Sequence, residues 1–152
     1  MSALELPSEI NNLIASGSWP LTGEEMWRSG RVPSALVAQL VPLYDDVGLC
    51  VPPFKTVFES LQEEGSQGFF HEYGAIDEID PARTLVIGDF GIGSDAPIAL
   101  DYRISHSPRV IYLYYEPMGQ DLDEECRTHW AVCCETFAAF SEALGLARCS
   151  WR

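Results

Sequence analysis

The stretch that decides the fold is Thr84-Leu-Val-Ile-Gly-Asp-Phe-Gly-Ile-Gly-Ser-Asp-Ala-Pro-Ile-Ala-Leu-Asp-Tyr-Arg103. It opens with a short apolar run at 84–87. From residue 98 to 103, large apolar side chains at 98, 100 and 102 alternate with a small or charged side chain at 99, 101 and 103, which is typical of a strand. Residues 110–115, dense in β-branched and aromatic side chains, predict another strand. Because turn-rich segments at 88–96 and 104–108 separate these runs, we expect an antiparallel meander.

Helices are predicted on both sides of the meander. Apolar residues at helical spacing predict helices over residues 4–16, 33–44, 54–63 and 135–144. Pro42 should kink or divide the second helix, which Gly48 helps to close, while Gly17 and Gly145 end the first and the last.

Two further strands are predicted outside the meander, over residues 69–73 and 128–132. A length of 152 residues favours one domain. We therefore expect a single α+β domain over residues 1–152, in which helices flank a twisted, mainly antiparallel sheet.

The charge balance is the unusual feature of the composition. Nine basic residues stand against twenty-three acidic ones, which gives a formal net charge of −14. Nucleic acids and anionic membranes both require a basic footprint, so the sequence argues against either as a partner. Such a field attracts and steers basic proteins instead, although the same excess is also found where charge serves only solubility.

The sequence lacks the features of an exported or membrane-spanning chain. No apolar run reaches the roughly 18 residues that a membrane span requires, and the first residues do not have the pattern of a signal peptide. The five cysteines are odd in number, with Cys133 and Cys134 adjacent, so they do not form a disulfide framework. We therefore expect a cytoplasmic protein with reduced, mostly buried thiols.

The glycines in the deciding stretch raise the question of a phosphate-binding loop. Gly88-x-x-Gly-x-Gly lacks the order of a dinucleotide fingerprint, and no Gly-Lys-Ser/Thr follows it. The segment leads into a strand, so no helix N-terminus would face a phosphate. Asp89 and Asp95 also lack the spacing of a calcium loop. We interpret residues 88–96 as a tight connection between two strands.

Candidate catalytic and metal-binding residues are few. The histidines at 71, 106 and 129 are scattered along the chain and form no constellation for general-base catalysis. Cys126-x-x-His129-x-x-x-Cys133 offers three metal ligands, but on the expected strand Cys126 and Cys133 point to opposite faces. We therefore expect no enzyme activity, no cofactor and no metal. A small metal- or thiol-dependent enzyme built on Cys126, His129 and Cys133 is the least favoured alternative.

Three stretches resemble one known family. Gly91-Ile-Gly-Ser-Asp-Ala-Pro-Ile-Ala-Leu-Asp-Tyr-Arg103 and Pro108-Arg-Val-Ile-Tyr-Leu113 are similar to the central strands of the SUKH superfamily. Trp130-Ala-Val-Cys-Cys-Glu-Thr-Phe-Ala-Ala-Phe140 resembles its terminal strand and helix. The family's usual Leu-Pro-x-x-Tyr helix opening is replaced by Arg31-Val-Pro-Ser-Ala, and the first 80 residues match in general layout alone.

The resemblance implies an α+β fold and a non-enzymatic role, typically that of a cytosolic immunity protein that neutralises a toxin, often a nuclease. The family also includes a fungal cell-wall regulator, so a regulatory scaffold of a housekeeping pathway is the alternative. No catalytic residue carries over from the family. We expect the matching residues to fix the turn and the strand rather than to touch a partner, and these are Gly91, Gly93, Asp95, Pro97 and Asp101.

Together, charge and resemblance predict a module that occludes a basic partner, a toxin domain, with an acidic face. The acidic segment between the last two expected strands is the predicted rim of that contact, through Asp121, Asp123, Glu124 and Glu125. The alternative for this segment is a solvated loop without a partner.

Overall fold

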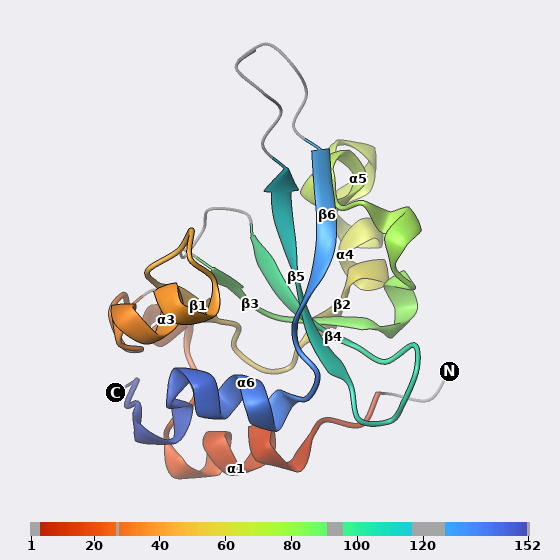
Figure 1. The fold of residues 1–152 in the computed structure, drawn as a ribbon. Helices are drawn as coiled ribbons and strands as arrows, with labels where there is room; N and C mark the ends of the chain where they lie inside the picture. The colour runs from red at the N-terminus through yellow and green to blue at the C-terminus, as the bar shows by residue number, and fades with distance from the viewer. Residues whose placement is uncertain (1–3, 27, 91–95, 117–126, 152) are drawn as a thin grey trace.

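One antiparallel sheet organises the molecule (Figure 1). The computed structural model describes residues 4–26, 28–90, 96–116 and 127–151. Its strands are β1 (Val47–Leu49), β2 (Lys55–Thr56), β3 (Thr84–Phe90), β4 (Pro97–Asp101), β5 (Arg109–Glu116) and β6 (Arg127–Cys134). They are ordered β1-β3-β4-β5-β6, and β2 also pairs with β3. The predicted meander is confirmed as β3, β4 and β5, and β6 extends it.

Helices cover both faces of this sheet, which confirms the α+β class. The helices are α1 (Ser8–Ser16), α2 (Gly23–Met26), α3 (Ser34–Leu40), α4 (Val57–Glu64), α5 (Phe69–Tyr73) and α6 (Phe137–Leu144). Short 3-10 turns are η1 (Gly65–Gln67), η2 (Ile76–Glu78), η3 (Pro81–Arg83) and η4 (Leu146–Arg148). In Figure 1, α1, α3 and α6 lie at the lower left of the sheet, and α4 and α5 lie at its right.

The two faces bury very different amounts of apolar surface. The larger core lies against α1, α3 and α6, and its fully buried side chains include Trp19, Phe140 and Trp151. The smaller core is built on five buried residues, Val57, Phe70, Ile79, Ala99 and Ile111. Most of the hydrophobic stabilisation therefore comes from the larger core, and the side with α4 and α5 is held by fewer contacts.

The ends of the predicted helices follow local chemistry. Gly17 and Gly145 adopt the left-handed conformation, with φ of 81° and 63°, and end α1 and α6 as expected. The helix from Pro33 stops at Leu40, before Pro42, as expected of a proline that cannot continue the hydrogen-bond ladder. The third helix begins at Val57 rather than at residue 54, because Thr56 forms a capping box with Glu59.

The prediction of a strand at residues 69–73 is wrong, because these residues form α5. The rings of Phe69 and Tyr73, four residues apart, meet with centroids 5.7 Å apart, and Phe70 points into the smaller core. Aromatic residues are enriched in strands, so the composition of this run predicts a strand. As a helix, the run packs its apolar side chains against α4 and the sheet.

Gly48 does not close a helix but lies in β1, and β3 continues through Phe90, so residues 88–90 are strand rather than turn. Gly48 pairs with Asp89, and the carbonyl oxygen of Gly48 lies 2.5 Å from where a Cβ on Gly88 would stand. Gly88 is therefore required for the close approach of two strands, not for a turn.

Candidate functional site

The far end of the β5–β6 hairpin is the candidate site, because both ends of the predicted acidic rim attach there. In this part of the hairpin Tyr114 pairs with His129, Tyr115 with Thr128, and Glu116 with Arg127. Asp121, Asp123, Glu124 and Glu125 belong to the segment between Glu116 and Arg127 and lie outside the described residues. The structure therefore describes the base from which this segment leaves the sheet.

His129 joins two carboxylates at this base. Its Nδ1 lies 2.8 Å from Glu78 Oε2, and its Nε2 lies 3.1 Å from Glu116 Oε2. Carboxylates only accept hydrogen bonds, so an imidazole must carry both protons to satisfy the two at once. Hydrogen bonds to Glu78 and Glu116 accordingly raise the pKa of His129 above its ordinary value of 6.5.

Glu78, on η2, is the centre of a small network. Its Oε1 accepts a hydrogen bond from the Trp130 backbone N–H at 2.9 Å, and its carbonyl oxygen accepts one from Arg103 Nη1 at 2.7 Å. Burial alone would raise the pKa of Glu78, but the Trp130 N–H and His129 outweigh it and lower the pKa. Glu78 thus ties η2 to β6 through its carboxylate and to Arg103, just after β4, through its backbone carbonyl.

Carboxylates of other elements gather beside this network. A shallow hollow here is lined by α5, η2 and the start of β6, and its titratable side chains are His71, Glu72, Asp77, Glu78, Arg127 and His129. Two of the three histidines that are scattered in the sequence therefore lie at one hollow. His106 lines a different hollow, next to Arg103. This end of the molecule thus presents acidic groups from α5, η2 and β5 around one bridging histidine.

A row of aromatic rings leads from α3 to the same end. Tyr44 stacks on Phe90 with centroids 5.8 Å apart, Phe90 meets Tyr112 edge-on, and Tyr112 contacts Tyr114. The row ends at His129, whose ring lies 5.7 Å from that of Tyr114. Tyr44, Tyr112 and Tyr114 are only half-buried, so part of each ring is accessible. Tyrosine is enriched in protein-binding surfaces relative to the rest of a protein surface.

The residues of the family-like motif have mainly structural surroundings where they are described. Pro97 and Asp101 are the buried ends of β4, whereas Gly91, Gly93 and Asp95 lie outside the described residues. Asp101 Oδ1 accepts from Arg103 Nε at 3.0 Å, and Asp101 Oδ2 accepts from Arg109 Nη2 at 2.9 Å. Burial would raise the pKa of Asp101, but these two guanidinium groups lower it. Asp101 therefore ties the end of β4 to Arg103 and to the start of β5 through Arg109.

The described thiols are poorly suited to nucleophilic chemistry. Burial raises the pKa of Cys50 to about 11 and that of Cys133 to about 12. It also raises the pKa of Cys134 and Cys149. A nucleophilic cysteine must be a thiolate, so these four side chains are protonated and unreactive near neutral pH.

The described part of the chain does not assemble the metal-ligand set of the least favoured alternative. Within it, no group of three or more His, Cys, Asp or Glu side chains is arranged to hold a metal ion. Both ring nitrogens of His129 already meet carboxylates. His129 and Cys133 lie four residues apart on β6, about 13 Å along an extended strand, too far for one ion. Cys126 lies outside the described residues.

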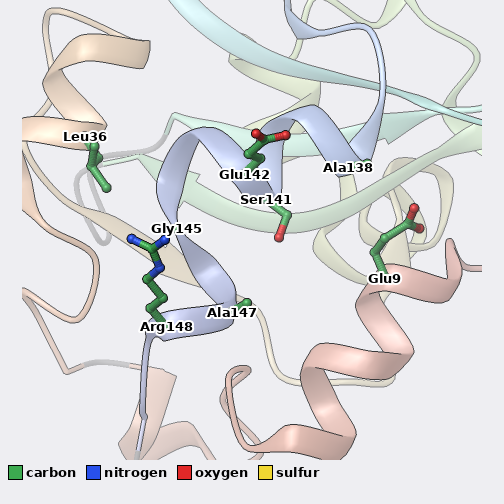
Figure 2. A pocket seen from close by; sticks show the side chains of 8 residues that line it. All are labelled: Glu9, Leu36, Ala138, Ser141, Glu142, Gly145, Ala147 and Arg148. Atoms are coloured by element: carbon green, nitrogen blue, oxygen red, sulfur yellow. The ribbon is translucent and has the colours of Figure 1, made fainter.

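A third hollow lies at the opposite end of the molecule, between α1, α3, α6 and η4 (Figure 2). Figure 2 shows Glu9 on α1, Leu36 on α3 and Arg148 on η4 around the small side chains of α6. Its lining combines Ala138, Ser141 and Gly145 with a few charged groups. Among the described residues that line this hollow, Ser141 is the one hydroxyl and no histidine is present.

Sequence reasoning identified the acidic segment but missed the network at its base. Glu78 and His129 are 51 residues apart, and no spacing rule links them. The strands expected from the sequence place Glu116 just before the acidic segment and His129 just after it. A contact from η2 could not be found without the fold.

Comparisons with known proteins give no match, whether with family models, curated proteins or solved structures. Across the described residues, none of the helices has the length and apolar character that crossing a membrane requires. The function is therefore argued from the chemistry of the chain itself.

Proposed function

We propose that this protein is a non-enzymatic, acidic protein-binding module, most specifically a cytosolic immunity protein that neutralises a basic, nuclease-like toxin by occlusion. The observation that carries the proposal is the net charge of −14. A surface with this excess repels phosphates and attracts cationic proteins over distances set by the ionic strength. A nuclease must present cationic side chains to its own phosphate substrate, so it is a partner of fitting chemistry.

The geometry of the β5–β6 end supports the same proposal. Glu72, Asp77, Glu78 and Glu116 come from three elements and surround the base of the acidic segment. Charge at such a rim increases the association rate, whereas buried aromatic contacts set most of the affinity. The half-exposed row of Tyr44, Tyr112 and Tyr114 supplies aromatic groups, and its last member, Tyr114, contacts His129 at that rim.

The raised pKa values of the buried thiols favour this role over the thiol-enzyme alternative. A protein that blocks another by contact requires no nucleophile, cofactor or metal. Elemental analysis of the purified protein tests the metal alternative separately, since stoichiometric zinc would revive it.

The experiment is a capture from native cells with tagged protein at low salt, followed by a salt step to about 0.5 M, where the Debye length falls to a few Å. We expect a stoichiometric basic protein in the eluate, whose nuclease activity is inhibited when the protein is added back. A neutral or acidic partner that resists the salt step would contradict the proposal and favour the scaffold role.

Two variants of equal net charge locate the contact. One neutralises the acidic segment through Asp121→Asn, Asp123→Asn, Glu124→Gln and Glu125→Gln. The other neutralises four acidic side chains on other elements through Glu5→Gln, Glu24→Gln, Asp45→Asn and Glu142→Gln, all of which are exposed. We expect the first variant to lose capture and the second to keep most of it. Equal losses would show that only overall charge matters.

A further inference from the structure

The segment from the last residue of α5 through η2 lies along the outer edge of β6 without pairing with it as a strand. We call residues 73–78 the strap. The Tyr73 carbonyl accepts a hydrogen bond from Thr128 Oγ1, and the Gly74 carbonyl accepts one from Trp130 Nε1 at 2.7 Å. Glu78 Oε1 accepts the Trp130 backbone N–H, which points to the outer edge of the sheet. A terminal strand exposes such groups to other chains unless something covers them.

The strap is held mainly by side chains, so its closure depends on few contacts. Three of its hydrogen bonds to β6 involve a side chain of Thr128, Trp130 or Glu78. The fourth contact is Glu78 Oε2 with His129 Nδ1 at 2.8 Å. Ala75, within the strap, has a φ of 42°, a conformation that costs a non-glycine residue about 1–2 kcal/mol. The closed strap therefore includes a strained position that its contacts must hold.

We propose that residues 73–78 act as a pH-sensitive strap that covers the outer edge of β6 while His129 bridges Glu78 and Glu116, and releases that edge when the bridge is lost. A neutral imidazole donates a single hydrogen bond, so it can satisfy one of the two carboxylates and not both. The other carboxylate then faces a ring nitrogen that carries no proton. The negative charges of Glu78 and Glu116 also repel each other once the imidazole between them is neutral.

The charged surroundings of His129 set where this change occurs. The groups that face it are Glu116 on β5, Asp77 and Glu78 on the strap, Arg127 on β6, and His71 and Glu72 on α5. The carboxylates favour the imidazolium, whereas Arg127, paired across from Glu116, opposes it. The pKa of His129 is raised, so the effect of the carboxylates is the larger one. The strap is therefore closed below the raised pKa of His129 and opens as the pH rises through it. This inference does not depend on the proposed partner.

The test is hydrogen exchange of the Trp130 backbone amide, followed by NMR from about pH 5.5 to about pH 8.5, across the range in which histidines titrate. The titration of the His129 ring is recorded on the same samples. In the wild-type protein, we expect the protection factor of this amide, corrected for intrinsic exchange, to fall several-fold as the His129 ring titrates. The variant His129→Gln should show low protection without a pH step.

Two further variants keep the test decisive. His106→Gln removes an exposed imidazole near the other hollow and should keep the wild-type step. Glu116→Gln leaves the Glu78–His129 pair but removes the negative charge of Glu116, which raises the pKa of His129. The fall in Trp130 protection should therefore move to lower pH. The proposal is overturned if Trp130 protection stays constant while His129 titrates, or if the step stays in place in Glu116→Gln or survives in His129→Gln.

Discussion

Two ionic clusters of opposite sign stand at different ends of the central strands. At the end of β4, the carboxylate of Asp101 lies between the guanidinium groups of Arg103 and Arg109, at 3.0 Å and 2.9 Å. Near the start of β6, the imidazole of His129 lies between the carboxylates of Glu78 and Glu116, at 2.8 Å and 3.1 Å. Each cluster places one charge between two opposite charges.

The clusters differ in burial and in the chemistry of the central group. The side chain of Asp101 is 0% exposed, whereas that of His129 is 34% exposed. The pKa of Asp101 is lowered below 3.8, so its charge changes only in acid, whereas histidine changes its charge near neutrality. The same arrangement therefore serves a permanent structural contact at one end and a condition-dependent contact at the other. The acidic segment that we propose as the partner rim attaches at the second end.

Removing the central charge of the buried cluster should give the largest effect. Asp101→Asn leaves two guanidinium groups around a neutral amide, and we expect it to lower the free energy of unfolding by about 3 kcal/mol. Urea denaturation measures this loss. Glu24→Gln is the control, because Glu24 is 85% exposed and lies 3.7 Å from Arg28. It should change stability by less than about 0.5 kcal/mol. Equal effects of the two variants would contradict a structural role for Asp101.

Changing the geometry of the buried cluster without its charge should cost less. Arg103 contacts both oxygens of Asp101 through Nε and Nη2 and also donates to the Glu78 carbonyl. Arg103→Lys keeps the positive charge but cannot reproduce this fork, and we expect a loss of about 1–2 kcal/mol in unfolding free energy. A fully stable Arg103→Lys protein would mean that charge alone holds Asp101.

At the second cluster, Glu78→Gln should cost about 1 kcal/mol in unfolding free energy. Glutamine can still accept the Trp130 N–H, so the main loss is the ionic contact with His129. NMR titration of the ring gives the sharper measurement, since the pKa of His129 should fall toward 6.5. A pKa of His129 that does not change would show that Glu78 has no influence on its charge.

The two clusters should respond to pH in opposite directions. The folded-state pKa of His129 is raised above 6.5, so its contribution to stability is present below 6.5 and is lost as the pH rises through the raised value. The folded-state pKa of Asp101 is lowered below 3.8, so its contribution is present above 3.8 and is lost as the pH falls through the lowered value. Denaturation at a series of pH values in wild type, His129→Gln and Asp101→Asn measures both.

The variants should each remove one side of this pH dependence. His129→Gln should flatten the decline in stability above pH 6.5, and Asp101→Asn should flatten the decline in acid. Unchanged alkaline behaviour in His129→Gln would contradict the role assigned to the bridge.

Patterns with a short period were predictable from the sequence, and long-range contacts were not. The meander followed from the alternation around Ile98, and α6 from its apolar face and Gly145. β1 and β2 contain three and two residues, too few to establish a period, and they exist because they pair with β3. The strand expected at 69–73 was wrong because packing on α4 and the sheet outweighs the β-propensity of an aromatic run.

The candidate site also combines a feature that was predictable from the sequence with contacts that were not. The acidic segment was identified from composition alone, but the network at its base requires η2 to lie against β6. Gly88 was interpreted as part of a turn, although its lack of a Cβ serves the contact with Gly48 in a strand that the sequence did not reveal. Residues whose role depends on a distant element carry no local signal.

We propose that excess negative charge directs this protein to a basic partner. The most direct test measures the dissociation constant of the purified complex, with the partner recovered by capture, at salt concentrations from about 0.05 M to about 0.5 M, over which the Debye length falls several-fold. We predict a basic partner whose dissociation constant rises steadily with salt and rises less in the variant with a neutral acidic segment. A dissociation constant independent of salt, or a partner without basic surface, would contradict the claim.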